Sequence, residues 1–145
     1  MLRTDKEKLM SFFQEKCKRH SLSITPQRVA IYEELIKSKN HPNSEDIFEK
    51  VKNLFPNIAL DTVYRTLSTF AEIGVANVVE GYGEAKRYDP DTTAHHHFRC
   101  RRCNKILDFH NRRYDNLPVP KSFRRGFDVM NIKVVLEGLC DKCMK

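Results

Sequence analysis

Residues 61–88, DTVYRTLSTFAEIGVANVVEGYGEAKRY, decide the fold class of this 145-residue chain. Apolar side chains recur at helical spacing from Asp61, the expected N-cap, to Ile73, and Gly74 is expected to end the helix. Two short strands around Gly81-Tyr82-Gly83 then form a hairpin. A helix followed by such a hairpin predicts the closing half of a winged helix-turn-helix.

Three more helices are expected before this segment. Apolar periodicity predicts the first, and hydroxyl caps before apolar stripes predict the other two. Pro26 after Thr25 strengthens the second start, because proline is favoured at the first helical position. The expected helices are 5–19, with Cys17 as a small buried apolar side chain, Thr25-Pro26 to about Lys37, and Ser44 to about Phe55. The fold class is therefore α+β with an N-terminal winged helix.

The expected helix over 61–73 has one face of hydrogen-bonding side chains with few acids: Thr62, Tyr64, Arg65, Ser68 and Thr69. In a winged helix this face would enter the DNA major groove, although an ordinary solvated surface has the same composition. The net charge of +7 does not decide the matter. Residues 89–145 carry 12 basic and 7 acidic groups, and four thiolates holding one Zn(II) ion would lower that excess from +5 to +3.

Four of the five cysteines form two Cys-x-x-Cys pairs, Cys100 with Cys103 and Cys140 with Cys143. Two such pairs complete a closed tetrahedral zinc site. Disulfides are disfavoured in a reducing cytosol, and a redox dithiol is the other alternative. The 36 residues between the pairs require an intervening subdomain to bring them together.

The second half of the chain is expected to form a small α/β domain. Strands are predicted over 98–102, 105–110 and 128–139, with an irregular or weakly helical stretch over 111–127. So small a domain needs additional stabilisation, which explains a zinc site and predicts dimerisation. The expected boundaries are 1–88 for the winged helix, 89–93 for a hinge and 94–145 for the dimerisation and metal-binding domain.

Histidines 95–97 form an uninterrupted run. On a strand, His95 and His97 point to one face and His96 to the other. Two imidazoles on one face can chelate an ion, with Asp89 and Asp108 near enough to add oxygens and His41 able to reach across from the first domain. A sulfur-free site of this kind suits Fe(II), Mn(II) or Zn(II). A polar hairpin rim is the alternative without metal.

A zinc hydrolase is the alternative from another functional class. Such an enzyme needs a general base beside the metal-bound water. No glutamate occurs in the ten residues after the histidine run. This argues against an enzyme.

Three segments, taken together, resemble the ferric uptake regulator (Fur) family. They are His41-Pro42, Asp61-Thr62-Val63-Tyr64-Arg65-Thr66-Leu67 and the stretch from His95 to Phe109, HHHFRCRRCNKILDF. The resemblance covers nearly the whole chain, to the closing Cys140-Asp141-Lys142-Cys143. It implies a homodimeric, metal-dependent repressor that binds duplex DNA and is not an enzyme.

The resemblance also implies the residues of each site. The four paired cysteines match the structural zinc ligands, and three nitrogens and two oxygens match a regulatory site for Fe(II) or Mn(II), with Zn(II) able to substitute. The expected regulatory ligands are His41, Asp89, His95, His97 and Asp108, and the expected DNA-contacting residues are Arg28, Thr62, Tyr64, Arg65 and Ser68.

Aspartate at both carboxylate positions resembles the peroxide-sensing branch (PerR) of that family, since iron regulators usually have glutamate there. This implies that hydrogen peroxide, acting through Fe(II), converts His41 or His95 to 2-oxo-histidine and ends repression. An iron- or zinc-level sensor without peroxide reactivity is the alternative within the family.

The chain is expected to be cytoplasmic. No apolar run approaches the roughly 20 residues of a membrane helix. The first residues alternate charges where a signal peptide needs an apolar stretch.

Overall fold

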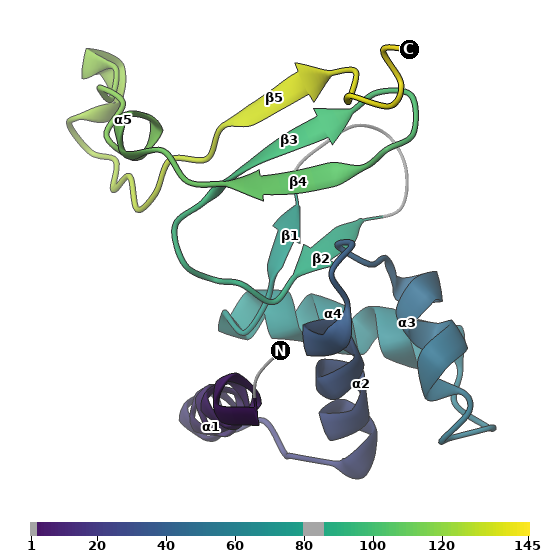
Figure 1. The fold of residues 1–145 in the computed structure, drawn as a ribbon. Helices are drawn as coiled ribbons and strands as arrows, with labels where there is room; N and C mark the ends of the chain where they lie inside the picture. Colours follow the sequence, from purple (N-terminus) through teal and green to yellow (C-terminus); the bar gives the residue numbers. More distant parts are fainter. Residues whose placement is uncertain (1–2, 80–85) are drawn as a thin grey trace. The chain divides into compact units, whose positions relative to one another are not determined.

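A computed structural model of the chain describes residues 3–79 and 86–145 (Figure 1). It divides into two compact units, residues 1–92 and 93–145. Helices and two small sheets confirm the α+β class. The first unit contains α1 (Arg3–Arg19), α2 (Pro26–Lys37), α3 (Ser44–Val51), α4 (Leu60–Ile73), β1 (Asn77–Val79) and β2 (Arg87–Asp89).

The core of the first unit forms where α1, α2 and α4 place aromatic side chains together. Phe13 and Tyr32 stack with ring centroids 4.4 Å apart, and Phe70 meets Phe13 edge to face at 5.3 Å. Cys17 is fully buried in the same cluster, as predicted. Burial of these rings holds the three helices together and leaves the opposite face of α4 available.

The helix ends confirm some sequence predictions and correct others. Thr25 caps α2, and Gly74 ends α4 with a positive φ of 84° that glycine adopts without strain. The prediction that Ser44 caps the third helix is wrong. Asn43 caps α3 in a capping box with Asp46, in which the side chain of each residue accepts a hydrogen bond from the backbone N–H of the other. This helix also ends at Val51 rather than near Phe55.

Asp61 was also expected to cap a helix, and it does not. The N-cap of α4 is Ala59, which makes no side-chain capping bond, and Asp61 lies in the first helical turn. There its carboxylate forms an ion pair with Arg65 one turn later, and a negative charge at a helix N-terminus is favourable.

Strands β1 and β2 form the predicted antiparallel hairpin, with Val78 opposite Tyr88. The predicted turn Gly81-Tyr82-Gly83 lies outside the described residues. Asp89 was expected in the hinge, but it is the last residue of β2. Pairing continues beyond the hairpin, because Asn43 forms an antiparallel bridge with Arg87.

The second unit has one sheet of three strands in the order β4-β3-β5: β3 (His96–Cys100), β4 (Ile106–Phe109) and β5 (Val135–Gly138). Strand β4 runs antiparallel to β3, and β5 runs parallel to it. Residues 110–134, the connector, hold the short helices α5 (Arg112–Asp115) and η1 (Lys121–Phe123). The predicted strand over 128–139 is too long. Its pairing with β3 begins only at Val135, which lies opposite His97.

No helix in the described parts of the chain is long and apolar enough to cross a membrane.

Candidate metal centres and DNA-contacting face

Four cysteine thiols meet at one end of the second unit. Cys100 ends β3, Cys103 lies in the turn after it, and Cys140 and Cys143 follow β5. Parallel pairing of Cys100 with Gly138 brings the two Cys-x-x-Cys segments together across the 36 intervening residues.

The spacing of the sulfurs suits one tetrahedral ion. All four Sγ atoms lie within 4.8 Å of one another, and those of Cys103 and Cys140 are 3.8 Å apart. A tetrahedral Zn(II) with Zn–S bonds of about 2.3 Å separates its sulfurs by about 3.8 Å. The donor set therefore fits a structural zinc ion.

Backbone N–H groups favour the thiolate form within this cluster. Those of Cys103, Cys140 and Arg102 lower the pKa of Cys100 to about 6, and the N–H of Cys140 lies 3.4 Å from the Cys100 sulfur. The Arg102 guanidinium also donates to the carbonyl of Cys143 at 2.6 Å, which ties the two turns together. Cys100 is thus prepared to bind a cation as a thiolate, whereas the contact with Cys140 raises the pKa of Cys143 to about 12.

A sulfur-free cluster occupies the other end of β3. The Nε2 atoms of His95 and His97 are 3.1 Å apart, as two nitrogens bound to one ion would be. One Asp108 carboxylate oxygen lies 3.1 Å from His97 Nε2 and 3.7 Å from His95 Nε2. The predicted placement of His95 and His97 on one face is confirmed, since their Nε2 atoms approach each other and the same Asp108 oxygen.

The His95 ring is oriented for metal binding. Its Nδ1 lies 2.8 Å from the carbonyl oxygen of Thr93. A carbonyl only accepts, so this geometry assigns the proton to Nδ1 and leaves the Nε2 lone pair facing His97 and Asp108. A hydrogen bond of this kind is the usual way in which a protein orients a metal-binding histidine.

The two remaining candidate ligands lie together in the first unit. His41 Nε2 is 3.4 Å from an Asp89 carboxylate oxygen, and both side chains are buried. The antiparallel bridge between Asn43 and Arg87 places residue 41 opposite residue 89. His41 has a positive φ of 53°, a conformation in which histidine is enriched among non-glycine residues.

Sequence reasoning missed the residue that holds His41 in this place. The Arg87 guanidinium donates to the carbonyl of His41 at 2.7 Å and also to that of Asn40. An arginine in a strand carries no sequence signal for such a role, because the role depends on where the preceding loop folds.

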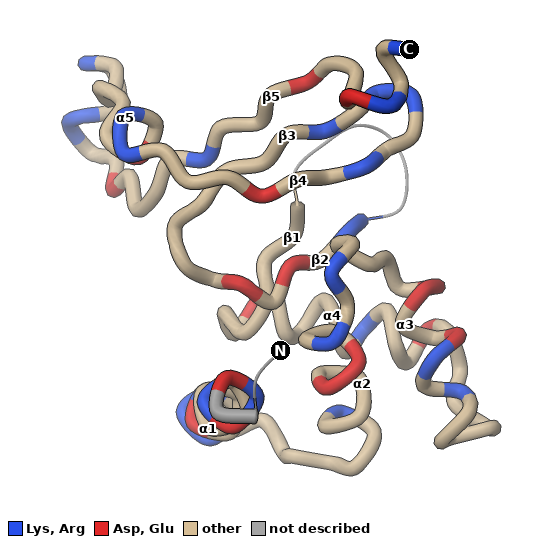
Figure 2. Tube along the Cα trace, in the orientation of Figure 1, with Lys and Arg blue, Asp and Glu red and all other residues tan. Residues whose placement is uncertain are grey.

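The candidate DNA-contacting side chains lie mainly on the outer face of α4. Thr62, Tyr64 and Arg65 are exposed and Ser68 is partly exposed, whereas Val63 and Leu67 are buried. Arg28 lies on α2, where its guanidinium donates to the carbonyl of Ser23 at 2.7 Å. Charged positions are not concentrated on α4: α1 carries both acidic and basic residues, and several basic positions lie at and around α5 (Figure 2).

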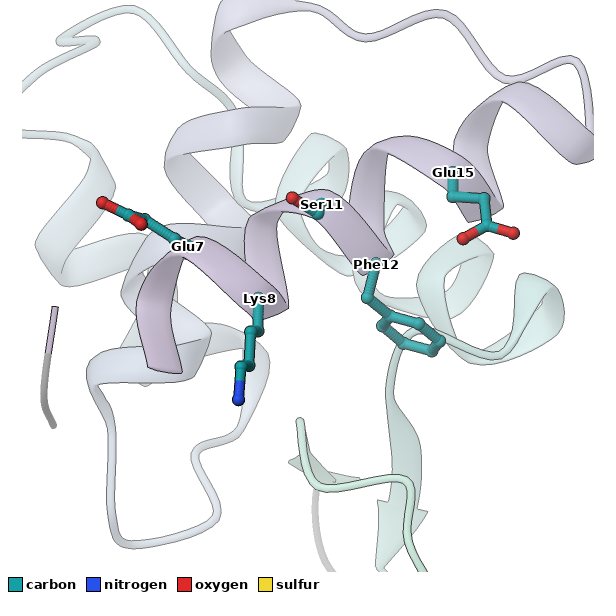
Figure 3. Close-up of a pocket in the computed structure, with 5 residues that line it drawn as sticks. All are labelled: Glu7, Lys8, Ser11, Phe12 and Glu15. Atoms are coloured by element: carbon teal, nitrogen blue, oxygen red, sulfur yellow. The ribbon is translucent and has the colours of Figure 1, made fainter. Parts of the chain in front are cut away.

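A shallow hollow lies beside α1. Among the described residues, its lining comes from that one helix: Glu7, Lys8, Ser11, Phe12 and Glu15 (Figure 3). Side chains from a single helix do not converge on a substrate from several directions, as those of a binding pocket do.

A winged helix joined to a unit with a thiolate cluster and a sulfur-free histidine and aspartate cluster defines a metal-responsive transcriptional regulator. The sequence model of the ferric uptake regulator family matches residues 19–137. The chain belongs to this family.

Curated relatives agree with this assignment. The chain is 37% identical over 132 residues to the peroxide operon regulator of Bacillus subtilis, with 90% of each chain covered. It is 35% identical over 120 residues to the peroxide-responsive repressor PerR of Staphylococcus epidermidis, covering 83% of this chain and 80% of that one. These relatives are regulators, which confirms that the chain is not an enzyme.

Solved structures share the fold. The ferric uptake regulator of Helicobacter pylori matches with a TM-score of 0.74 at 20% identity, over 96% of this chain and 93% of that one. PerR from Streptococcus pyogenes, described as a peroxide sensor, matches with a TM-score of 0.51 at 27% identity, over 90% of each chain.

Proposed function

We propose that this protein is a homodimeric repressor that binds duplex operator DNA in the cytoplasm and releases it in response to hydrogen peroxide. The observation that carries the proposal is the sulfur-free cluster of His95, His97 and Asp108, whose nitrogen and oxygen donors suit Fe(II) and Mn(II). The peroxide-responsive relatives support the same reading.

We further propose that one regulatory ion uses ligands from both units: His41 and Asp89 from the first, and His95, His97 and Asp108 from the second. Only five residues, 90–94, lie between Asp89 and His95 in the chain. An ion bound by all five side chains would restrain residues 90–94 between them. Metal binding would thereby couple to DNA binding through one mechanical element.

The DNA contacts are assigned to α4 and to the start of α2. Thr62, Tyr64, Arg65 and Ser68 lie on the helix that enters the major groove in a winged helix-turn-helix. Arg28, near the start of α2, is assigned a further DNA contact. Dimerisation is assigned to the second unit, where apolar side chains are exposed at Phe127 and Met130 and a partner copy would cover them.

Peroxide sensing would consume the protein. Fe(II) held by these side chains would supply redox chemistry toward hydrogen peroxide that Mn(II) lacks. In the net reaction the oxygen–oxygen bond would break, one peroxide oxygen would replace the hydrogen on a ring carbon of His41 or His95, and the other would leave as water. The imidazole would lose the two electrons that the peroxide gains and become 2-oxo-histidine. The altered ring is a poorer ligand, so the ion would leave and repression would end.

Peptide mass spectrometry after brief exposure to hydrogen peroxide tests this proposal. Protein loaded with Fe(II) should gain one oxygen on the peptide that contains His41 or His95, and protein loaded with Mn(II) should not. Asp108→Ala is the control: it should keep zinc and the dimer but lose both the oxidation and metal-dependent DNA binding.

Two results would contradict the proposal. No oxidation in either loaded form would leave a sensor of iron or zinc levels. Absence of binding to any duplex DNA with Mn(II) present would exclude a metal-dependent repressor altogether.

A further inference from the structure

His96 is the one member of the histidine run that the proposed regulatory site does not use, and it is almost fully buried, with 1% of its surface exposed. Its Nε2 lies 2.7 Å from an Asp115 carboxylate oxygen, and the backbone N–H of Val134 donates to its Nδ1 at 3.0 Å. Because a backbone N–H only donates, Nδ1 must be the acceptor. The geometry therefore assigns the proton to Nε2, which donates to Asp115.

These two bonds join three segments that are distant in the sequence. His96 begins β3, Asp115 ends α5, and Val134 directly precedes β5. Val134 makes a second hydrogen bond to β3, because its carbonyl accepts from the backbone N–H of His97 at 3.2 Å. In Figure 1, α5 lies beside the end of β4 and the start of β5. The bonds thus fasten both ends of the connector to β3.

Aromatic rings hold the imidazole from the sides. Phe109 and Tyr114 lie with ring centroids 5.6 and 5.8 Å from that of His96. Asp115 is itself positioned by α5, where its backbone N–H donates to the carbonyl of Asn111 at 3.1 Å. The imidazole therefore has one defined orientation.

We infer that His96 and Asp115 are a positioning pair that orients His95 and His97 for metal binding; this inference rests on the regulatory site proposed above. Neighbouring side chains on a strand point to opposite faces. Fixing His96 on one face therefore fixes the backbone that presents His95 and His97 on the other. The effect is needed at this end of the strand, because His95 precedes the first ladder position, His96 opposite Phe109.

The test compares two variants without the negative charge of Asp115. Asp115→Asn keeps an oxygen that accepts from His96, and Asp115→Leu does not. Full-length, zinc-loaded protein is titrated with Mn(II), and free Mn(II) is followed by electron paramagnetic resonance. We expect Asp115→Leu to bind Mn(II) about 10- to 100-fold more weakly and Asp115→Asn to bind it nearly as well as the unaltered protein. Zinc content and dimer should be unchanged in both.

Asp128→Leu is the matched control, since Asp128 is an exposed acid of the same connector. It should bind Mn(II) as the unaltered protein does. If Asp115→Leu loses zinc, Asp115→Ser, which is smaller and polar, takes its place in the comparison with Asp115→Asn.

The possible failures are distinguishable. If the unaltered protein binds no Mn(II), the proposed regulatory site and this inference both fail. If it binds Mn(II) and the leucine or serine variant binds it equally well, the positioning role is wrong and the proposed function stands. A parallel weakening in Asp115→Asn would also overturn the inference, because the hydrogen bond would then not be the cause.

Discussion

The position of the Arg65 side chain depends on a neighbouring acid. The side chain is exposed on α4, and its guanidinium pairs with Asp61 one turn earlier. An exposed pair of this kind contributes little to stability. The pair does hold the Arg65 side chain beside the N-terminal half of α4. In a recognition helix this is the part that approaches base edges.

We expect Arg65→Ala to weaken operator binding by about 1–3 kcal/mol, roughly 5- to 150-fold, and to relax the preference for operator over random DNA. The measurement is fluorescence anisotropy on both DNAs with Mn(II) present. Lys50→Ala is the control, since Lys50 is an exposed cation on α3 outside the proposed contact face. An equal loss on operator and random DNA would instead identify Arg65 as a phosphate contact.

At the scale of elements, the packing of α1 on α2 depends on Tyr32. Its ring stacks on Phe13, and its hydroxyl donates to the carbonyl of Leu9 at 3.3 Å. Burial, together with the nearby Cys17 thiol, raises the pKa of Tyr32 to about 12 from its ordinary value of 10. The Tyr32 hydroxyl therefore loses its proton at a higher pH in the folded protein than in the unfolded chain.

Stability should consequently depend on this group in alkaline solution. The contribution of Tyr32 is fully present below pH 10 and is lost as the pH rises from 10 toward 12, because the unfolded state then binds fewer protons. In Tyr32→Phe we expect a loss of about 1 kcal/mol at neutral pH and a weaker decline of stability above pH 10. Urea unfolding between pH 7 and 11, followed by circular dichroism, measures both.

Tyr64→Phe serves as the control for this measurement, since Tyr64 is an exposed tyrosine of α4. Its alkaline decline should match that of the unaltered protein. If Tyr32→Phe declines as steeply as the unaltered protein, the alkaline sensitivity has another source.

The helix boundaries show where local sequence was sufficient. Thr25-Pro26 and Gly74 were predicted as a start and a stop, and both were confirmed, because capping needs only nearby atoms. Asn43 was missed because its neighbour Ser44 is an equally good cap by residue type. Only the capping box with Asp46 favours Asn43. The length of β5 was missed because strand ends depend on a partner strand.

For the whole molecule, we expect folding of the second unit to depend on an ion bound by its four cysteines. That unit has few buried apolar side chains, chiefly Ile106 beside Cys100 and Cys140. Metal binding to such a site contributes folding free energy directly. The first unit has its own aromatic core and does not depend on this cluster.

We expect Cys100→Ser to lose zinc, unfold the second unit and abolish the dimer, while the first unit keeps its helices. Metal analysis, limited proteolysis and analytical ultracentrifugation check the three effects. Cys17→Ala is the control, because this buried cysteine lies in the other unit, and it should keep zinc and the dimer. A dimer in zinc-free Cys100→Ser protein would show that the second unit folds without the ion.

The amino-acid sequence by itself determined the helical periodicity, the two Cys-x-x-Cys pairs and the alternation that separates His96 from His95 and His97. These features depend on residues a few positions apart, whose geometry the backbone dictates. The sequence also predicted that the two cysteine pairs share one site, but only the tertiary structure decided how Cys100 meets Cys140, that His41 lies opposite Asp89 through strand pairing, and that Asp115 accepts from His96. Each of these contacts spans 19 to 48 positions. Such contacts depend on sheet register and loop path, which are set by the packing of a whole unit rather than by any short segment.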